Sequence, residues 1–254
     1  MKDIELWKGD CLELMNNIPD KSVDMVLCDP PYGTTACKWD FVIPFDKMWG
    51  GVNRIIKDNG AIVLFGNEPF SSKLRMSNIN NYRYDWKWDK VRGVGHLLAH
   101  KRPMMCIEDI MVFYKDLPTY NPQMRYRDKP RKSENNGKYE CWGGDNKHFE
   151  GEVLDEKYPI NLLKFTKTDM TVNCYHPTQK PIPLLQYLIK TYTVEGERVL
   201  DFTMGSGSTG VACKTLNRKF IGIELDDKYF DIAKQRIENG YVQEEISDNE
   251  FPLF

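Results

Sequence analysis

The tetrapeptide Asp29-Pro30-Pro31-Tyr32 places an acid, two prolines and an aromatic ring directly after an apolar segment, residues 23–28. The prolines restrict the backbone and remove two N–H donors, so the Pro30 carbonyl and the Asp29 carboxylate remain as a pair of acceptors. Such a pair suits an exocyclic amine, which has two hydrogens to donate, and the Tyr32 ring offers a stacking face for a planar base that contributes about 1 to 3 kcal/mol. Ligands of open α/β sheets bind beyond the carboxyl ends of strands. We therefore predict a catalytic site formed by Asp29, Pro30, Pro31 and Tyr32; the alternative is a rigid turn whose acid caps a helix.

A glycine-rich turn forms a second candidate site. Residues 199–210 contain G-x-G-x-x-G between a predicted strand and a predicted helix, and Glu224 ends the next strand. This spacing is typical of dinucleotide binding, with the later acid on a ribose hydroxyl pair. However, Asp201 stands where a pyrophosphate would approach, and a carboxylate there suits a cation such as the ammonium or sulfonium of S-adenosylmethionine. The remaining alternative is a tight turn that binds nothing.

Apolar runs of strand length alternate with segments of helical spacing, which predicts an α/β fold with a mostly parallel sheet covered by helices. Only about thirty residues follow Glu224, too few for the further βαβ units of a dinucleotide domain, so the N-terminal strands must complete the sheet in a circularly permuted order. The predicted strands are 6–10, 23–29, 61–65, 84–88, 107–114, 198–201 and 220–224, and the predicted helices are 45–56, 184–192, 210–215 and 229–237.

The composition is that of an ordinary soluble globular protein: 254 residues, 41% hydrophobic and 28% charged. It excludes a collagen, a coiled coil and a disordered chain. Apolar runs stay below the roughly 18 residues that a membrane span needs, and the first residues show no signal peptide. The seven cysteines stand singly, without a C-x-x-C pair, which favours neither a disulfide framework nor a zinc site. We expect no metal, no membrane partner and a cytoplasmic location.

The small net charge of -2 conceals an uneven distribution. Residues 83–102 hold six Lys/Arg against two acids, and residues 115–138 hold seven against three, whereas residues 224–250 hold nine acids against three bases. A basic middle is expected if one face meets a polyanion. Trp86 and Trp88 alternate with charged residues and are expected in the core. The candidate DNA-binding residues are Arg92, His96, Lys101, Arg102, Arg125, Arg127, Arg131 and Lys132.

Three further segments complete a recognisable set: Lys8-Gly9-Asp10, His176-Pro-Thr-Gln-Lys-Pro181 and Gly222-Ile-Glu224. Together with the two candidate sites, they resemble the β-group amino DNA methyltransferases, in which Asp-Pro-Pro-Tyr precedes the cofactor loop. The resemblance covers about residues 4–115 and 174–238. The sequence is similar to the short phage or prophage type of these enzymes, which implies a bacterial or phage-infected cell. The resemblance implies a three-layer αβα Rossmann-like methyltransferase fold, circularly permuted, with an inserted target-recognition region.

This resemblance divides the chain into three parts. Residues 1–115 are expected to form the catalytic half and residues 173–254 the cofactor-binding half of the same sheet. Residues 116–172 are polar, rich in turn signals and weakly periodic, and are expected to be the target-recognition region or a large loop.

The resemblance implies S-adenosylmethionine as cofactor. Asp10 resembles the carboxylate that accepts from the cofactor's adenine amine, and Leu225 the residue that packs on its ring. Residues 178–180 are expected to line the methionine pocket, and His176 to be structural. The implied cofactor-binding set is Asp10, Cys11, Asp29, Lys180, Asp201, Phe202, Gly205, Gly207, Ser208, Thr209, Glu224 and Leu225.

The implied reaction moves a methyl group to the N6 amine of a flipped-out adenine in double-stranded DNA. An acid at position 29, where cytosine-N4 enzymes of the family often have Ser, favours adenine. A Pro-Cys nucleophile motif is absent from the sequence, and Cys28 is interpreted as a buried small residue. The alternatives are methylation of cytosine N4 or of an RNA base, an NAD-dependent oxidoreductase, and a catalytically silent DNA-binding relative. A homodimer and a cognate restriction endonuclease are left open as partners.

Overall fold

The computed structural model describes residues 3–34, 40–132, 153–166, 175 and 179–239. The chain forms two compact units, and each is described by itself. The first unit combines Met1–Asn121 with Asn161–Phe254, so its sequence is interrupted by the second unit, Pro122–Ile160. Among the described residues, no helix has the length and apolar character to cross a membrane, and no group of His, Cys, Asp and Glu side chains has the arrangement of a metal site.

An eight-stranded sheet forms the centre of the first unit, in the order β1-β10-β9-β2-β3-β5-β4-β8. Strands β1, β10, β9, β2 and β3 are parallel, β5 runs antiparallel to both of its neighbours, and β8 is parallel to β4. The strands are β1 (Ile4–Lys8), β2 (Val23–Cys28), β3 (Ile56–Gly66), β4 (Tyr82–Val94), β5 (Met105–Phe113), β8 (Leu162–Lys164), β9 (Arg198–Asp201) and β10 (Lys219–Glu224).

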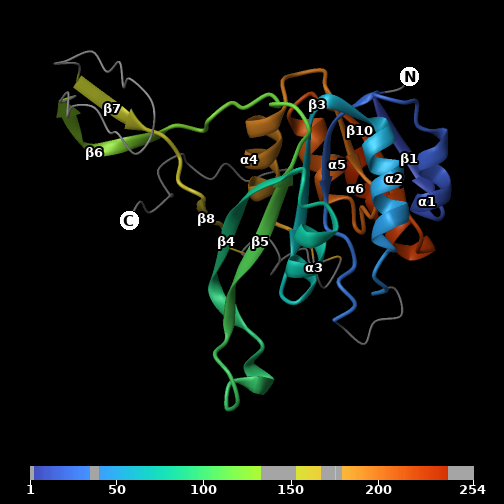
Figure 1. The fold of residues 1–254 in the computed structure, drawn as a ribbon, viewed down its shortest axis with the longest axis horizontal. Helices are drawn as coiled ribbons and strands as arrows, with labels where there is room; N and C mark the ends of the chain where they lie inside the picture. The colour runs from blue at the N-terminus through green and yellow to red at the C-terminus, as the bar shows by residue number, and fades with distance from the viewer. Residues whose placement is uncertain (1–2, 35–39, 133–152, 167–174, 176–178, 240–254) are drawn as a thin grey trace. The chain divides into compact units, whose positions relative to one another are not determined.

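Helices cover both faces of this sheet, which confirms the three-layer α/β prediction (Figure 1). On one face, α4, α5 and α6 pack against strand residues such as Leu27 and Val63. On the other face, α1, η1, α2 and α3 pack against alternate strand residues such as Val26 and Leu64. The helices are α1 (Cys11–Leu14), η1 (Met15–Asn17), α2 (Phe45–Ile55), α3 (Phe70–Ser77), η2 (His96–Leu98), α4 (Ile182–Tyr192), α5 (Ser208–Thr215) and α6 (Asp227–Asn239).

The local sequence explains why these elements begin and end where they do. In α2, Met48, Val52 and Ile55 recur at helical spacing and are all buried. Helix α4 begins after Pro181, whose fixed φ suits a helix entrance. Strand β1 ends before Asp10, two residues earlier than predicted, because the Asp10 carboxylate accepts the Leu12 N–H at 2.7 Å and caps α1.

The C-terminal strands β9 and β10 lie between β1 and β2, as the sequence required for a sheet completed from the N-terminus. Because β1, β2, β9 and β10 are parallel, their carboxyl ends share one edge of the sheet. After β9 the chain crosses the face of the sheet that α5 covers. After the neighbouring strand β2 it crosses the opposite face, which α2 covers. A pair of adjacent strands with opposite crossovers is a topological switch point, where ligands bind in open α/β sheets.

Strands β4 and β5 extend beyond the sheet as a two-stranded ribbon. Pairing of β3 with β5 ends at Gly66 and Asp109, while β4 and β5 continue to Val94 and Met105 and are joined through η2. The predicted pair of strands is therefore confirmed, with a longer β4. Trp86 and Trp88 lie in the core, as predicted; their indole N–H groups donate to the Tyr192 hydroxyl and to a backbone carbonyl.

The second unit contains the antiparallel strands β6 (Arg125–Lys132) and β7 (Val153–Lys157). This unit spans fewer residues than the predicted insertion of residues 116–172, because residues 116–121 and 161–166 belong to the first unit. The second unit ends at Ile160 because the chain then enters β8, which pairs with β4 at the edge of the main sheet and buries Leu163.

Candidate active site

A cavity of about 870 Å³ lies at the carboxyl ends of β2, β9 and β10. Its size falls within the roughly 300 to 1,000 Å³ of sites for small ligands and cofactors. Both candidate sites of the sequence line this one cavity: the tetrapeptide that follows β2 and the turn that follows β9. The switch point therefore brings together residues that are about 170 positions apart in the chain.

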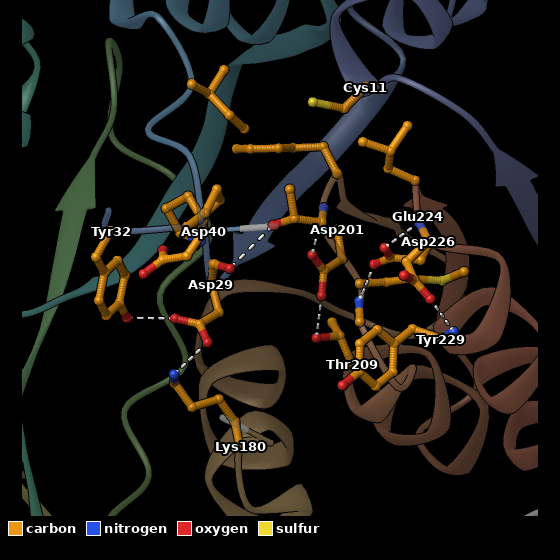
Figure 2. Close-up of a pocket in the computed structure, with 18 of the residues that line it drawn as sticks. Cys11, Asp29, Tyr32, Asp40, Lys180, Asp201, Thr209, Glu224, Asp226 and Tyr229 are labelled. Carbon is orange, nitrogen blue, oxygen red and sulfur yellow. Dashed lines mark hydrogen bonds and ion pairs between the residues drawn. The ribbon is translucent and has the colours of Figure 1, made fainter. Parts of the chain in front are cut away.

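Asp29 lies at the centre of the cavity with both carboxylate oxygens engaged. The Tyr32 hydroxyl donates to Oδ1, and the Lys180 ammonium contacts Oδ2 (Figure 2). The Tyr32 ring packs against Phe70 of α3, with ring centroids 5.0 Å apart. About a fifth of the Asp29 side chain is exposed, so one side of this carboxylate still faces the cavity.

Two buried charged residues that the sequence analysis did not include support this carboxylate. Glu108 of β5 accepts from Lys180 at 2.9 Å through Oε1 and from Lys90 of β4 through Oε2. Lys90, Glu108 and Lys180 are each less than a tenth exposed. Asp29, Glu108, Lys90 and Lys180 thus form a neutral chain of two acids and two bases.

These neighbours set the charges of the two acids. Burial alone would raise the pKa of Glu108, but the charges of Lys180 and Lys90 overcome it and hold that pKa at about 2. For Asp29, burial is the largest effect and leaves the pKa above its usual range, although the Lys180 charge lowers it and the Glu108 charge raises it. The ionisation of Asp29 is therefore a balance between desolvation and Lys180.

Asp201 ends β9 and is buried on the opposite side of the cavity from Lys180 (Figure 2). Its carboxylate accepts from the Thr209 hydroxyl at 2.7 Å and from the Thr203 N–H at 3.2 Å. Burial raises the pKa of Asp201 to about 7, against these hydrogen bonds. A buried acid bonded by neutral donors favours a cation beside it.

Glu224 ends β10 and reaches back to the glycine-rich turn. Its Oε2 accepts the Gly205 N–H at 2.8 Å, and its Oε1 accepts the Asp226 N–H at 2.9 Å. Gly205 has φ of +53°, a left-handed conformation that glycine adopts without strain. These bonds hold the carboxylate at the cavity wall, and each oxygen keeps a second lone pair for a ligand hydroxyl.

Comparison with known proteins identifies the family. The DNA methylase family matches residues 23–235, most of the chain. M2.DpnII, a type II methyltransferase of Streptococcus pneumoniae, is 51% identical in an alignment of 266 positions that covers 92% of this chain and 89% of that protein. This chain belongs to the DNA methylase family.

Two other comparisons agree with this assignment. The DNA adenine methyltransferase YhdJ of Escherichia coli strain K12 is 28% identical, over 94% of this chain and 85% of that protein. The structure of the M1.HpyAVI–SAM complex superposes with a TM-score of 0.63 at 25% identity, over 92% of this chain and 98% of that one. The cytosine-N4-specific PvuII DNA methyltransferase, with a TM-score of 0.68 at 17% identity over 97% and 89% of the two chains, shares the fold.

The protein is therefore a DNA methyltransferase that uses S-adenosylmethionine. The alternative of an NAD-dependent oxidoreductase, which came from the glycine spacing alone, has no support in these comparisons. The cavity fits the cofactor: buried Asp201 suits its cationic groups, the oriented Glu224 carboxylate suits its ribose hydroxyls, and Phe202 and Cys11 supply apolar lining.

Most residues predicted for the methyltransferase site line the cavity. They are Asp10, Cys11, Asp29, Pro30, Pro31, Tyr32, Lys180, Asp201, Phe202, Gly205, Ser208, Thr209, Glu224 and Leu225. Gly207 does not: a Cβ at this position would lie 2.8 Å from the Ala233 Cβ of α6. Its missing side chain thus serves helix packing in the structure, and its positive φ of +79° forms the entrance of α5. His176 and Thr178 lie outside the described residues.

Lys180, which was expected at the methionine pocket, lines the cavity. Its ammonium contacts Asp29 and Glu108, two ion pairs that the sequence motif did not predict. Its sequence neighbour Gln179 instead reaches the glycine-rich turn, where its side-chain oxygen accepts from the Ser206 hydroxyl at 3.2 Å.

Sequence reasoning missed four residues of the site. Glu108 carried a signal, since it is an acid within the apolar run of β5, and Thr203 stood within the glycine-rich turn. Lys90 and Asp40 carried none, because their roles depend on residues far along the chain or on the path of a loop. Asp40 accepts the N–H groups of Gly33 and Thr34 at 2.8 and 2.9 Å and so anchors the loop after Tyr32.

The predicted DNA-binding residues fall in two places. Arg92, His96, Lys101 and Arg102 are exposed on the β4–β5 ribbon, around η2. Arg125, Arg127, Arg131 and Lys132 lie on β6 in the second unit. Between Asp89 and Glu108 the ribbon carries no acid, so the exposed tip is positively charged.

Proposed function

We propose that this methyltransferase transfers a methyl group to the N6 amine of adenine in double-stranded DNA. One observation supports this most directly: the Asp29 carboxylate and the Asp201 turn line a single cavity, so an amine acceptor and a cation site face the same space. The residue roles that follow rest on this geometry.

The proposed catalytic residues act on the target amine. An adenine amine donates its two hydrogens to the Asp29 carboxylate and the Pro30 carbonyl while its ring stacks on Tyr32. These hydrogen bonds withdraw the nitrogen lone pair from the ring and direct it toward the methyl donor. S-adenosylmethionine supplies that methyl group on a sulfonium, which leaves with the bonding electron pair. The methylated amine then loses one proton to water.

The cofactor side of the cavity uses the carboxylates on the opposite wall. Glu224 accepts hydrogen bonds from the ribose hydroxyls of S-adenosylmethionine, and Asp201 neutralises the positive charge of its methionine part. The carboxylate of Asp10 is the acceptor proposed for the adenine amine of the cofactor, in addition to its capping bond to Leu12. Leu225 is two-thirds exposed at the cavity mouth, which leaves its side chain free to cover the cofactor ring.

Adenine is preferred to cytosine as the target for two reasons. The first is the acid at position 29, which resembles the adenine-specific form of the motif. The second is that a relative aligned over 94% of the chain is named a DNA adenine methyltransferase. Methylation of cytosine N4 on the same scaffold is the competing activity, because the PvuII enzyme shares the fold.

The target base must leave the duplex to enter the cavity, at a cost of a few kcal/mol. The basic tip of the ribbon, with Arg92, Lys101 and Arg102, is suited to phosphate contacts beside such a base. The β6–β7 unit, with a basic strand β6, is the proposed target-recognition region. Base-specific contacts from such a region determine which site is methylated.

Several relatives are named type II methyltransferases, which supports a role beside a cognate restriction endonuclease. The protein would then work in the cytoplasm, where the DNA is, as a monomer or a homodimer. Sedimentation with and without duplex DNA distinguishes these two states.

The reaction is tested by incubating the protein with unmethylated genomic DNA and methyl-labelled S-adenosylmethionine, followed by nucleoside mass spectrometry. Labelled N6-methyladenine is the expected product. Labelled N4-methylcytosine would overturn the choice of base while keeping the mechanism. No label in DNA although the cofactor binds would overturn the proposed substrate or the activity.

A further inference from the structure

The Tyr32 hydroxyl lies between two carboxylate acceptors, Asp29 and Glu108. This hydroxyl donates to Asp29 Oδ1, and the same oxygen atom lies 3.2 Å from Glu108 Oε1. A hydroxyl has one hydrogen to donate, so these two carboxylates are alternative acceptors for it. Both acceptors belong to the buried chain that also holds Lys180.

An amine that binds Asp29 meets an occupied carboxylate. Oδ2 is held by the Lys180 ammonium, and Oδ1 is held by Tyr32. Lys180 cannot move away cheaply, because it is buried and its departure would leave both Asp29 and Glu108 without this counter-charge. The Tyr32 hydroxyl can move cheaply, because Glu108 offers it a second acceptor and no buried donor is left unpaired.

Glu108 is well suited to receive this hydrogen bond. Lys180 and Lys90 neutralise it from two sides, and its low pKa of about 2 keeps it ionised at any pH at which the enzyme works. A hydrogen bond to a charged acceptor is stronger than one between neutral groups. Tyr32 therefore keeps a strong partner when it leaves Asp29.

We propose that the target amine replaces the Tyr32 hydroxyl on Asp29, that this hydroxyl passes to Glu108, and that Lys180 is the positioning residue that keeps Asp29 ionised and aimed at the amine throughout. The inference rests on the proposed role of Asp29 as the amine acceptor. It goes beyond that role by assigning functions to Lys180 and Glu108 and by giving Tyr32 a movement in addition to stacking.

Other groups also face Asp29 and enter the pH dependence. Asp201 on β9 and the Cys28 thiol on β2 each have a pKa that burial raises most and that the Asp29 charge raises further. Lys90 acts on Asp29 only through Glu108. Because Asp201 and Cys28 are unchanged in every variant below, differences between variants report on Lys180 and Tyr32.

The test is the pH dependence of methylation by the full-length enzyme on duplex DNA. The acid limb of kcat/KM reports ionisations of the free enzyme, and that of kcat reports those of the complex with substrate. In Lys180→Met, Asp29 loses its counter-charge in both states, so both acid limbs should move to higher pH while S-adenosylmethionine affinity changes less than about threefold. Lys180→Arg keeps the charge and should leave both limbs near their original positions.

The matched control is Lys190→Met, which removes an exposed lysine from the same helix region, at the end of α4, and should move neither limb. If Lys180→Met instead weakens cofactor binding and leaves the limbs in place, Lys180 belongs to the methionine pocket and the proposal is wrong. If Lys180→Met does not fold, the test rests on Lys180→Arg. A pH profile of Lys180→Arg that matches the wild-type profile supports the role of the charge, and a profile shifted to higher pH overturns it.

Tyr32→Phe tests the transfer of the hydroxyl separately. The ring remains for stacking, but the free enzyme loses a hydrogen bond to ionised Asp29. The acid limb of kcat/KM should therefore move to higher pH. The acid limb of kcat should keep its position, because in the complex with substrate the Tyr32 hydroxyl has already left Asp29. A shift in both limbs, or in neither, contradicts the transfer.

Failure of this inference is distinguishable from failure of the proposed function. If the wild-type enzyme does not methylate an amine of DNA, the proposed function fails before any variant is measured. If it does, and the variants behave in the contrary ways described, only the roles of Lys180, Glu108 and Tyr32 are overturned.

Discussion

The Thr203 hydroxyl donates a hydrogen bond to the backbone carbonyl of Asp29, 3.1 Å away. This bond joins the carboxyl end of β9 to that of β2, and thus the glycine-rich turn to the Asp-Pro-Pro-Tyr tetrapeptide. The same oxygen lies 3.0 Å from the Cys28 sulfur.

Thr203→Val should lower kcat about fivefold, because it removes one hydrogen bond worth about 1 kcal/mol that holds Asp29 in place relative to the methyl donor. S-adenosylmethionine affinity should change little, because the hydrogen bond that is removed faces β2. Thr203→Ser keeps the hydroxyl and is the control. Single-turnover rates and calorimetric titration measure the two quantities, and equal rates for Val and Ser variants would remove Thr203 from the site.

Asp29→Ala should abolish methyl transfer while leaving cofactor binding within a few fold, because its proposed partner is the target amine. Asp29→Asn keeps the shape but loses the charge that Lys180 neutralises, and should also be severely impaired. Rates are measured with labelled cofactor and dissociation constants by calorimetry. Turnover near the wild-type level in Asp29→Ala would refute the assignment.

Glu224→Ala should weaken S-adenosylmethionine binding by roughly 1.5 to 3 kcal/mol, on the order of ten- to a hundredfold in Kd, since it removes hydrogen bonds to a charged acceptor. The turn also loses the acceptor of the Gly205 N–H. Glu195→Ala, an exposed acid after α4, serves as the control. Cofactor affinity equal in the two variants would show that Glu224 does not hold the ribose.

Binding of S-adenosylmethionine should release a proton near neutral pH. The pKa of Asp201 is raised to about 7 by burial, so this acid is partly protonated in the free enzyme, and a bound cation favours its ionised form. Affinity should therefore rise with pH up to about 7 and level off above it.

Calorimetry just below neutral pH, in two buffers of different ionisation enthalpy, measures this proton release. The observed enthalpies should differ there and converge well above neutral pH, where Asp201 is already ionised. Asp201→Asn retains acceptor capacity for Thr209 but has no proton to release, so its enthalpies should agree in both buffers. Agreement in the wild-type enzyme below neutral pH would contradict the proposed cation site.

DNA affinity should depend on salt through the tip of the β4–β5 ribbon. Replacement of Arg92, Lys101 and Arg102 by Gln should reduce the slope of log K against log salt by about 0.9 for each phosphate that these side chains no longer neutralise. Replacement of three exposed lysines on helices α2, α3 and α6, Lys47, Lys73 and Lys234, is the control of equal charge. Slopes equal in both triple variants would place the DNA-binding surface elsewhere.

Local sequence patterns were sufficient to predict the layers of the fold and the two segments of the site. Apolar runs of strand length and helical spacing are local signals, so β2, β9, β10 and the helices α2, α4 and α6 were predicted to within a few residues. The Asp-Pro-Pro-Tyr and glycine-rich segments were equally readable, because neighbouring residues within each segment supply its chemistry.

How those segments meet depends on contacts between distant parts of the chain. The placement of β9 beside β2, the bond from Thr203 to Asp29, and the buried chain of Lys180, Glu108 and Lys90 join residues from distant parts of the sequence. No local pattern shows which strand becomes a neighbour, or that a lysine in a loop will be paired with an acid in a strand. The same reason explains why the contact of Lys180 with Asp29 and the close packing of Gly207 against α6 were not predicted.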